Sequence, residues 1–201
     1  KMVPASCLFG VMHSTEDGAD GASVTIDTWN NDCAAGKRSS STPFVLGRCV
    51  GGRDLYVTCD FETRWSRHCS SKLTARPGVV NWDSIGVDME HSTEKKIEFT
   101  PAQTREAACL WTYIQQRAKL PDSRLITHGE LQGHLPKDHK SYRTDPEGFD
   151  WAMFGRQIKK LRKNSKFDPN KFSADLPPSL VSLERADEAK TKPQAAIETS
   201  K

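Results

Sequence analysis

Two short apolar runs in this chain each lead into a histidine. Cys7 to Met12 precede His13, and Leu125 to Thr127 precede His128. Runs of this length, followed by polar and turn-forming residues, predict buried β-strands. In α/β sheets the functional residues lie beyond the carboxyl ends of the strands. We therefore expect both imidazoles at a functional edge of a sheet.

Further strands are predicted in the middle of the chain. Phe44 to Leu46 and Leu55 to Val57 are separated by a Gly-Gly turn, which predicts a β-hairpin. Ser84 to Glu90 alternates apolar and polar residues with the period of a strand. Asp88 and Glu90 should therefore point to one face of that strand.

Helical periodicity predicts three helices. The clearest has Thr100 as its N-cap and Pro101 at its first position, and it should end near Leu120. Its apolar stripe consists of Ala107, Leu110, Trp111, Ile114 and Ala118. An amphipathic helix over Asp150 to Lys163 should bury Trp151, Phe154, Ile158 and Leu161. A short helix with a less regular phase over Ser23 to Asn31 should partly bury Val24, Ile26 and Trp29.

The remaining segments are polar. Phe61 to Trp82 has no clear period, which favours a long surface loop over a site, and Gly129 to Gly148 is expected to be a polar loop. Residues 166–201 are rich in proline and charge and cannot bury much apolar surface. The sequence therefore predicts a single domain over residues 1–165 followed by a C-terminal tail.

Composition excludes several classes of function. The net charge is +3, from 29 basic and 26 acidic residues mixed along the chain, so no strong nucleic-acid-binding field is expected. The basic stretch Lys159 to Lys163 would suit such a partner, but a short basic helix end is usually a solvated face. No apolar run is long enough to span a membrane, and a signal peptide could have been removed.

The cysteines allow two interpretations. There are six, an even number, and none stands in C-x-x-C spacing, which argues against a cysteine-rich zinc site. Cys49 and Cys59 flank the hairpin turn and could face each other in a disulfide, with buried free thiols as the alternative. We expect at least one disulfide, and hence an oxidising compartment such as the periplasm or the cell exterior.

The histidines at the strand ends suggest metal chemistry. With Asp145 they offer two imidazoles and a carboxylate, a common three-ligand set for zinc that leaves a position for water. Bound zinc brings the pKa of such a water near neutrality, and the hydroxide can attack an amide carbonyl. By spacing alone the other histidines, His68, His91, His134 and His139, are equally able to serve as ligands.

Four motif blocks occur in an order that resembles a known family. They are Ser84-Ile85-Gly86-Val87-Asp88-Met89-Glu90, Phe99-Thr100-Pro101-Ala102-Gln103, Ile126-Thr127-His128-Gly129-Glu130 and Arg143-Thr144-Asp145-Pro146-Glu147-Gly148-Phe149-Asp150-Trp151. Over residues 7–160 the chain resembles the type 2 N-acetylmuramoyl-L-alanine amidases, which include phage endolysins, peptidoglycan-recycling amidases and animal peptidoglycan recognition proteins.

The resemblance implies a fold, a cofactor and a reaction. The fold would be a single α/β domain with a central mixed β-sheet flanked by helices. Zn²⁺ would be bound by His13, His128 and Asp145. The enzyme, expected to be a monomer that is secreted or periplasmic, would hydrolyse bacterial peptidoglycan between N-acetylmuramic acid and the L-alanine of the stem peptide, using a metal-activated water.

The chain departs from the family pattern at two catalytic positions. Asp88 stands where the family usually has a glutamate that orients or deprotonates the water, and Glu90 could assist it. Arg143 replaces the usual lysine, and a guanidinium can stabilise an oxyanion but does not shuttle a proton. The simpler interpretations are a solvated strand edge for the acids and a surface salt bridge for Arg143.

Other residues are candidates for contacts with substrate. Trp65 and His68 lie where relatives have a tryptophan-histidine pair near the substrate, although Trp65 would equally suit the core. The loop between His128 and Asp145 is longer than usual in the family, and its basic residues and histidines could line a groove or simply be solvated. A non-catalytic peptidoglycan-binding protein is the alternative function, since some family members recognise the polymer without cutting it.

Overall fold

The computed structural model describes residues 9–15, 21–36, 41–59, 61, 68, 81, 84–133, 135–140 and 142–163. Several predictions therefore lie outside the described residues: those for the tail 166–201, for most of the segment 61–82 with Trp65, for His134, and for Cys7, Cys69 and the side chain of Cys33.

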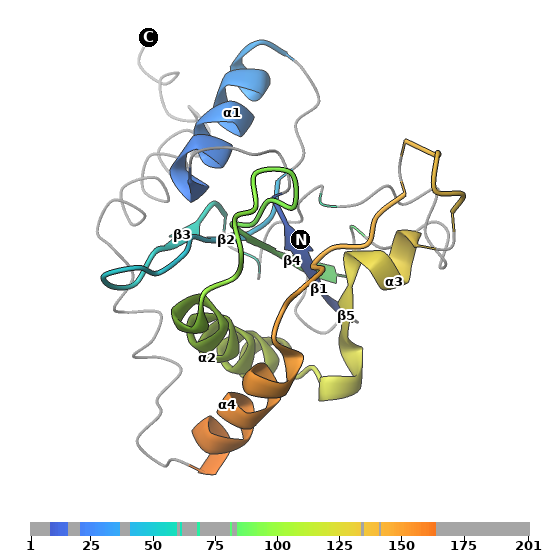
Figure 1. The fold of residues 1–201 in the computed structure, drawn as a ribbon. Coiled ribbons are helices and arrows are strands. Elements are labelled where there is room, and N and C mark those ends of the chain that lie inside the picture. The colour runs from blue at the N-terminus through green and yellow to red at the C-terminus, as the bar shows by residue number, and fades with distance from the viewer. Residues whose placement is uncertain are drawn as a thin grey trace, which may run out of the picture.

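One mixed sheet of five strands crosses the middle of the molecule (Figure 1). The strands are β1 (Phe9–Ser14), β2 (Phe44–Leu46), β3 (Leu55–Val57), β4 (Ser84–Met89) and β5 (Leu125–Thr127), in the order β3-β2-β4-β1-β5. β1 lies parallel to both β4 and β5, β2 is parallel to β4, and β3 is antiparallel to β2. The expected mixed sheet is confirmed, and parallel pairing brings the carboxyl ends of β1, β4 and β5 to one edge.

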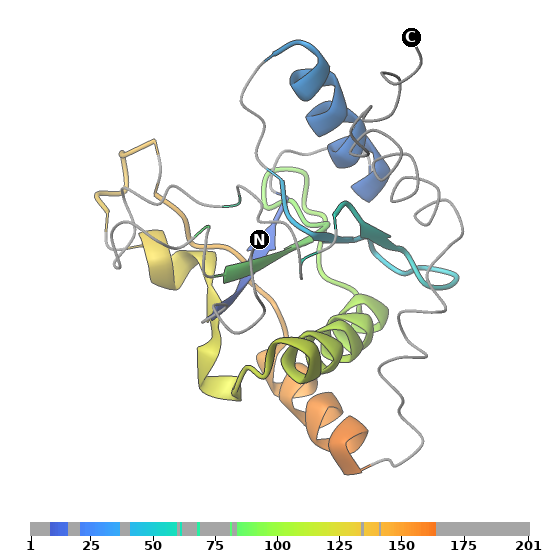
Figure 2. The same cartoon turned by 180° about the vertical axis from the view of Figure 1, so that it is seen from behind.

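Helices cover the sheet. They are α1 (Ala22–Ala34), α2 (Pro101–Ala118), α3 (His128–Gln132), α4 (Trp151–Lys163) and the 3-10 turn η2 (Asp122–Arg124). Figures 1 and 2 show α2 and α4 packed together on one side of the sheet and α1 on the other. Of the described helices, none combines the length and apolar character needed to cross a bilayer.

The alternation of side chains along β1 and β4 separates a core face from a polar face. Met12 and the apolar residues of β4 join the α2 stripe in the main hydrophobic core. On this face Gly10 lets the fully buried Trp111 ring lie directly against the strand. The opposite face presents His13, Gly86 and Asp88, which makes it the face for chemistry.

Helix α2 forms as its local signals predict. The side chain of Thr100 accepts a hydrogen bond from Gln103 N, and Gln103 Oε1 accepts one from Thr100 N. Pro101 occupies the first turn. All five residues of the predicted stripe are buried. Gln103 Nε2 also donates to the carbonyls of Leu46 and Glu90, which ties the helix to the ends of β2 and β4.

Three local predictions need correction. Val24 is 40% exposed, although the short helix was expected to bury it in part, and Trp151 is 39% exposed instead of facing inward. Trp151 stands at the first position of α4 and packs edge-on against Phe149, at the end of the core. The segment expected to be a polar loop begins with α3, which is capped by Thr127 and Glu130 in a capping box that the sequence displays as T-x-x-E.

The predicted Cys49–Cys59 disulfide is wrong, because Cys49 is a free, buried thiol. The hairpin register explains the difference. Leu46 pairs with Leu55, so Cys49 lies toward the turn, whereas Cys59 lies beyond Val57 at the far end of the ladder. Cysteines at opposite ends of a hairpin cannot approach to disulfide distance.

Candidate metal centre

The two strand-end histidines meet because their strands are neighbours. Met12 pairs with Thr127 in the parallel register of β1 and β5, so His13 and His128 both follow at the same edge. Their ring centroids are 4.3 Å apart at an interplanar angle of 60°. Both side chains are buried, with exposed fractions of 3% and 8%.

Asp145 completes the cluster from the long connection before α4. Its Oδ2 accepts a hydrogen bond from Ser14 N at 3.0 Å, and its Oδ1 lies 3.2 Å from His128 Nδ1. His13 Nδ1 lies 4.0 Å from Asp145 Oδ2. Gly129 N donates to the Asp145 carbonyl at 2.9 Å, which attaches this connection to α3. The carboxylate therefore faces the Nδ1 atoms of both histidines.

The donor set fits a zinc ion. The three residues offer one ligand atom each within 4.8 Å of one another, and all three are buried. Burial lowers the pKa of His13 well below its usual value, and His128, His68 and Arg143 lower it further. A neutral imidazole is the form that binds a metal. Two buried imidazoles beside a buried carboxylate are therefore a ligand set suited to Zn²⁺.

His68 lies behind His13 rather than at an exposed surface. Its Nδ1 is 2.9 Å from His13 Nε2, its Nε2 is 3.0 Å from Ser84 Oγ, and the residue is only 6% exposed. Burial, with a contribution from nearby His128, lowers the pKa of His68 to about 3. The structure thus brings the predicted candidate His68 to the cluster, buried against His13.

The two candidate acids have different surroundings. Asp88 is half-buried on β4 and pairs with His13 in the parallel register, so both side chains project from the same face. Glu90 follows the end of the strand, and its carboxylate accepts hydrogen bonds from the backbone of Ala22, the first residue of α1, and from Arg48. Burial raises the pKa of Glu90. Asp88 neighbours the cluster, whereas Glu90 stabilises the start of α1.

Arg143 is exposed and precedes Asp145 by two residues. Its Nη1 donates to the carbonyls of Lys140 at 3.0 Å and Tyr142 at 2.7 Å, which holds the side chain along its own loop. Its charge acts on His13, whose pKa it lowers. Arg143 therefore lies within electrostatic reach of the cluster.

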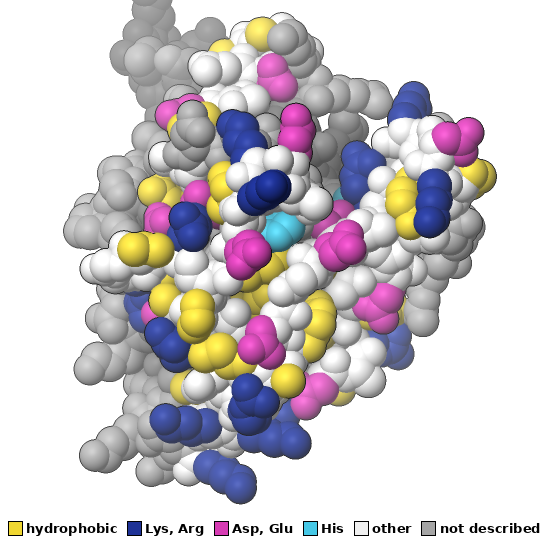
Figure 3. All heavy atoms as spheres, viewed as in Figure 1, with side chains coloured by type: hydrophobic (Ala, Val, Ile, Leu, Met, Phe, Trp, Pro, Cys, Tyr) yellow, Lys and Arg dark blue, Asp and Glu magenta, His cyan; other side chains and the backbone are white. Residues whose placement is uncertain are grey.

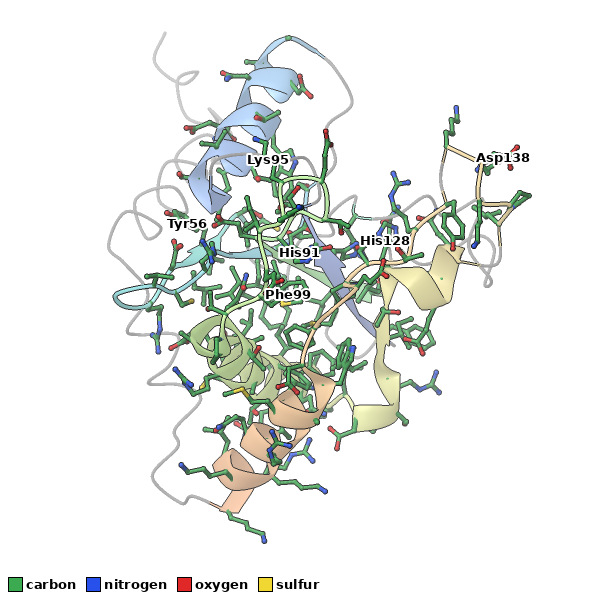
Figure 4. The ribbon with its side chains drawn as sticks, in the orientation of Figure 1. Tyr56, His91, Lys95, Phe99, His128 and Asp138 are labelled. Atoms are coloured by element: carbon green, nitrogen blue, oxygen red, sulfur yellow. The ribbon has the colours of Figure 1, made fainter. Side chains whose placement is uncertain are left out.

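Of the remaining histidines, His91 packs against an aromatic side chain. Its ring stacks on Phe99 with centroids 4.2 Å apart and an interplanar angle of 8°. Figure 4 shows the pair close together, with His128 nearer to α3. On this face of the space-filling view a histidine is visible near the centre among acidic side chains (Figure 3).

Sequence reasoning missed two residues that support the centre. The Ser84 hydroxyl is in hydrogen-bond contact with His68 Nε2, and Gly86 leaves the space that the His68 ring occupies. A Cβ on residue 86 would lie 2.7 Å from His68 Cγ. The signal was present, because a glycine inside a strand often marks a close approach. Ser84, Gly86 and Asp88 alternate along one face of β4.

A mixed β-sheet flanked by helices, with a buried His-His-Asp cluster beside the carboxyl ends of its parallel strands, defines a candidate metallohydrolase. The model of the N-acetylmuramoyl-L-alanine amidase family matches residues 5–148. The chain belongs to this family of enzymes. Among curated proteins, no sequence match was found.

Solved structures share the fold at low sequence identity. AmpD is 18% identical with a TM-score of 0.55, over 76% of this chain and 84% of its own. AmiD from E. coli, in complex with the substrate anhydro-N-acetylmuramic acid-L-Ala-D-gamma-Glu-L-Lys, is 17% identical with a TM-score of 0.53, over 76% of this chain and 57% of its own. AmpDh3 from Pseudomonas aeruginosa, in complex with anhydromuramic pentapeptide, is 14% identical with a TM-score of 0.57, over 96% of this chain and 77% of its own.

Proposed function

We propose that this chain is a zinc-dependent enzyme that hydrolyses the amide between N-acetylmuramic acid and the L-alanine of the peptidoglycan stem peptide. The observation that carries the proposal is the buried cluster in which the Nδ1 atoms of His13 and His128 face the Asp145 carboxylate, in a chain that belongs to the amidase family. AmiD and AmpDh3 are solved with muramyl peptides, which supports a substrate of this class.

Zinc, its three ligands and Asp88 have separate roles in the proposed hydrolysis. When bound, zinc supplies a Lewis acid that acidifies a water molecule and polarises the amide carbonyl. His13, His128 and Asp145 would hold the zinc ion. Asp88, on the same strand face as His13, would orient the attacking water, accept its proton and pass that proton to the amine nitrogen of the leaving L-alanine.

Two charged residues complete the assignment. Arg143 stabilises the negative charge that develops on the carbonyl oxygen, since a guanidinium stays protonated throughout the reaction. Glu90 takes no part, because its carboxylate already accepts hydrogen bonds at the start of α1. Peptidoglycan as substrate implies action outside the cytoplasm, in the periplasm or beyond the cell.

The test measures zinc content and digestion of purified sacculi with the same protein samples. The wild type should bind one equivalent of zinc and release soluble stem peptides, and a chelator should stop the release. Asp145→Asn and His128→Ala should lose both properties. Asp88→Asn should keep zinc but lose about 10²–10⁴-fold in rate, the usual contribution of a general base.

Glu90→Gln is the matched control for Asp88→Asn, and it should keep both zinc and activity. Digestion that survives complete removal of zinc would refute the mechanism. Retention of a full zinc equivalent by Asp145→Asn would refute the ligand assignment. A wild type that binds zinc and sacculi without releasing peptide would be a recognition protein instead.

A further inference from the structure

We propose that His68 is a positioning residue that fixes the tautomer and the ring orientation of His13, with Ser84 as the outer end of a hydrogen-bonded row. The proposal rests on the proposed function in one respect: it takes His13 Nδ1 as a metal ligand. The row runs from His13 Nε2 to His68 Nδ1 at 2.9 Å and from His68 Nε2 to Ser84 Oγ at 3.0 Å.

The tautomer argument begins at His13. Its Nδ1 faces Asp145, 4.0 Å from the carboxylate. An imidazole whose Nδ1 lone pair points to a metal carries its proton on Nε2, and that N–H needs an acceptor when it is buried. His68 Nδ1 is in hydrogen-bond contact with it. Accepting at Nδ1 puts the proton of neutral His68 on Nε2, from which it donates to Ser84 Oγ.

The protein holds His68 in place for this contact. Its backbone N–H donates to Asn81 Oδ1 at 3.1 Å, and its ring lies over Gly86, where a Cβ would approach to 2.7 Å. The His68 ring meets the His13 ring edge-on, at 83° with centroids 5.0 Å apart. Ser84 and Gly86 belong to β4, which is paired with β1. The strand beside His13 therefore also positions the His68 ring, through the Ser84 hydrogen bond and the space over Gly86.

The contacts also separate His68 from the other roles open to a histidine. Both of its ring nitrogens are engaged, one by His13 and one by Ser84, which leaves no lone pair for a metal or a substrate. Within the described part of the chain, His128 Nε2 is buried without a hydrogen-bond partner, so only His13 has such a support there. Loss of a partner of this kind typically weakens metal affinity about 10–100-fold.

Two variants of similar size separate hydrogen bonding from packing. His68→Asn keeps an acceptor near the place of Nδ1, whereas His68→Leu fills the space without one. Zinc affinity is measured by competition with a chromophoric chelator, and the unfolding of each metal-free protein is measured alongside. We expect His68→Leu to bind zinc about 10–100-fold more weakly than the wild type, and His68→Asn to recover most of that loss.

If His68 acted only by packing, His68→Leu would bind zinc at least as well as His68→Asn, and that order would overturn the proposal. A second measurement needs no variant: ¹⁵N NMR of the imidazoles in the zinc-loaded wild type should find the protons of His13 and His68 on Nε2. A proton on His68 Nδ1 would also overturn it. Sacculus digestion separates the two proposals, since a zinc protein with this row that cuts nothing would contradict only the proposed function.

Discussion

Gly10 and Gly86 lie on neighbouring strands and face opposite sides of the sheet, so one added methyl group at each tests the two faces separately. A Cβ on Gly10 would lie 2.1 Å from Trp111 Cζ3, and the buried ring would have to move about 1.4 Å to reach the ~3.5 Å separation of carbon atoms in contact. A Cβ on Gly86 would lie 2.7 Å from His68 Cγ and 2.8 Å from Thr42 Cγ2, which calls for a shift of about 0.8 Å.

These displacements set the expected costs. Overpacking a core by a methyl group costs about 1–3 kcal/mol, and replacing glycine by alanine inside a strand returns about 0.5–1 kcal/mol of backbone entropy. Gly10→Ala should therefore lose about 2 kcal/mol or more, because Trp111 is large and 1% exposed. Gly86→Ala should lose about 1 kcal/mol, since its clash is milder.

The assay is urea unfolding of the metal-free proteins, with zinc affinity measured separately on the folded forms. Gly10→Ala should lower the free energy of unfolding without changing zinc affinity. Gly86→Ala should destabilise less but weaken zinc binding, because it displaces His68 from His13. The opposite pattern, with zinc affinity lost in Gly10→Ala and kept in Gly86→Ala, would refute the assignment of the two faces.

Two further predictions concern buried ionisable groups. Burial raises the pKa of Cys49 and of Cys109 to about 11, so about one thiol in 1000 is ionised at pH 8, and both should alkylate far more slowly in the native protein than after unfolding. Mass mapping of native samples checks this, and rapid labelling of either thiol would contradict it. Burial raises the pKa of Glu90 above its ordinary value of 4.5. The contribution of Glu90 to the free energy of unfolding is therefore fully present below pH 4.5 and is lost as the pH rises through the raised pKa of the folded protein. The stability of the wild type relative to Glu90→Gln should therefore fall over that window, and a difference that rises there would show that the folded protein favours the charged carboxylate.

Local signals in the sequence were sufficient for several elements. The capping residues and apolar stripe of α2 lie within one segment, so periodicity predicted both its start and its buried face. The strands that lead to His13 and His128 were likewise visible as apolar runs. Their convergence followed once both strands were assigned to one sheet, because parallel neighbours end at the same edge.

Long-range contacts were decided only by the tertiary structure. His68 is 55 residues from His13, and no local pattern indicates that its ring will lie against that histidine. The hairpin register separated Cys49 from Cys59, and the end of β4 at Met89 let Glu90 turn toward α1 while Asp88 stayed beside His13.

The sequence by itself therefore determined the main strands and the helices α2 and α4, together with the histidines that follow two of the strand runs, since periodicity and caps act over a few residues. The tertiary structure decided what surrounds those residues. Which side chains share a face, which nitrogen finds a partner and which carboxylate lies beside the histidines depend on strand order and register, and these are set by packing between segments far apart in the chain.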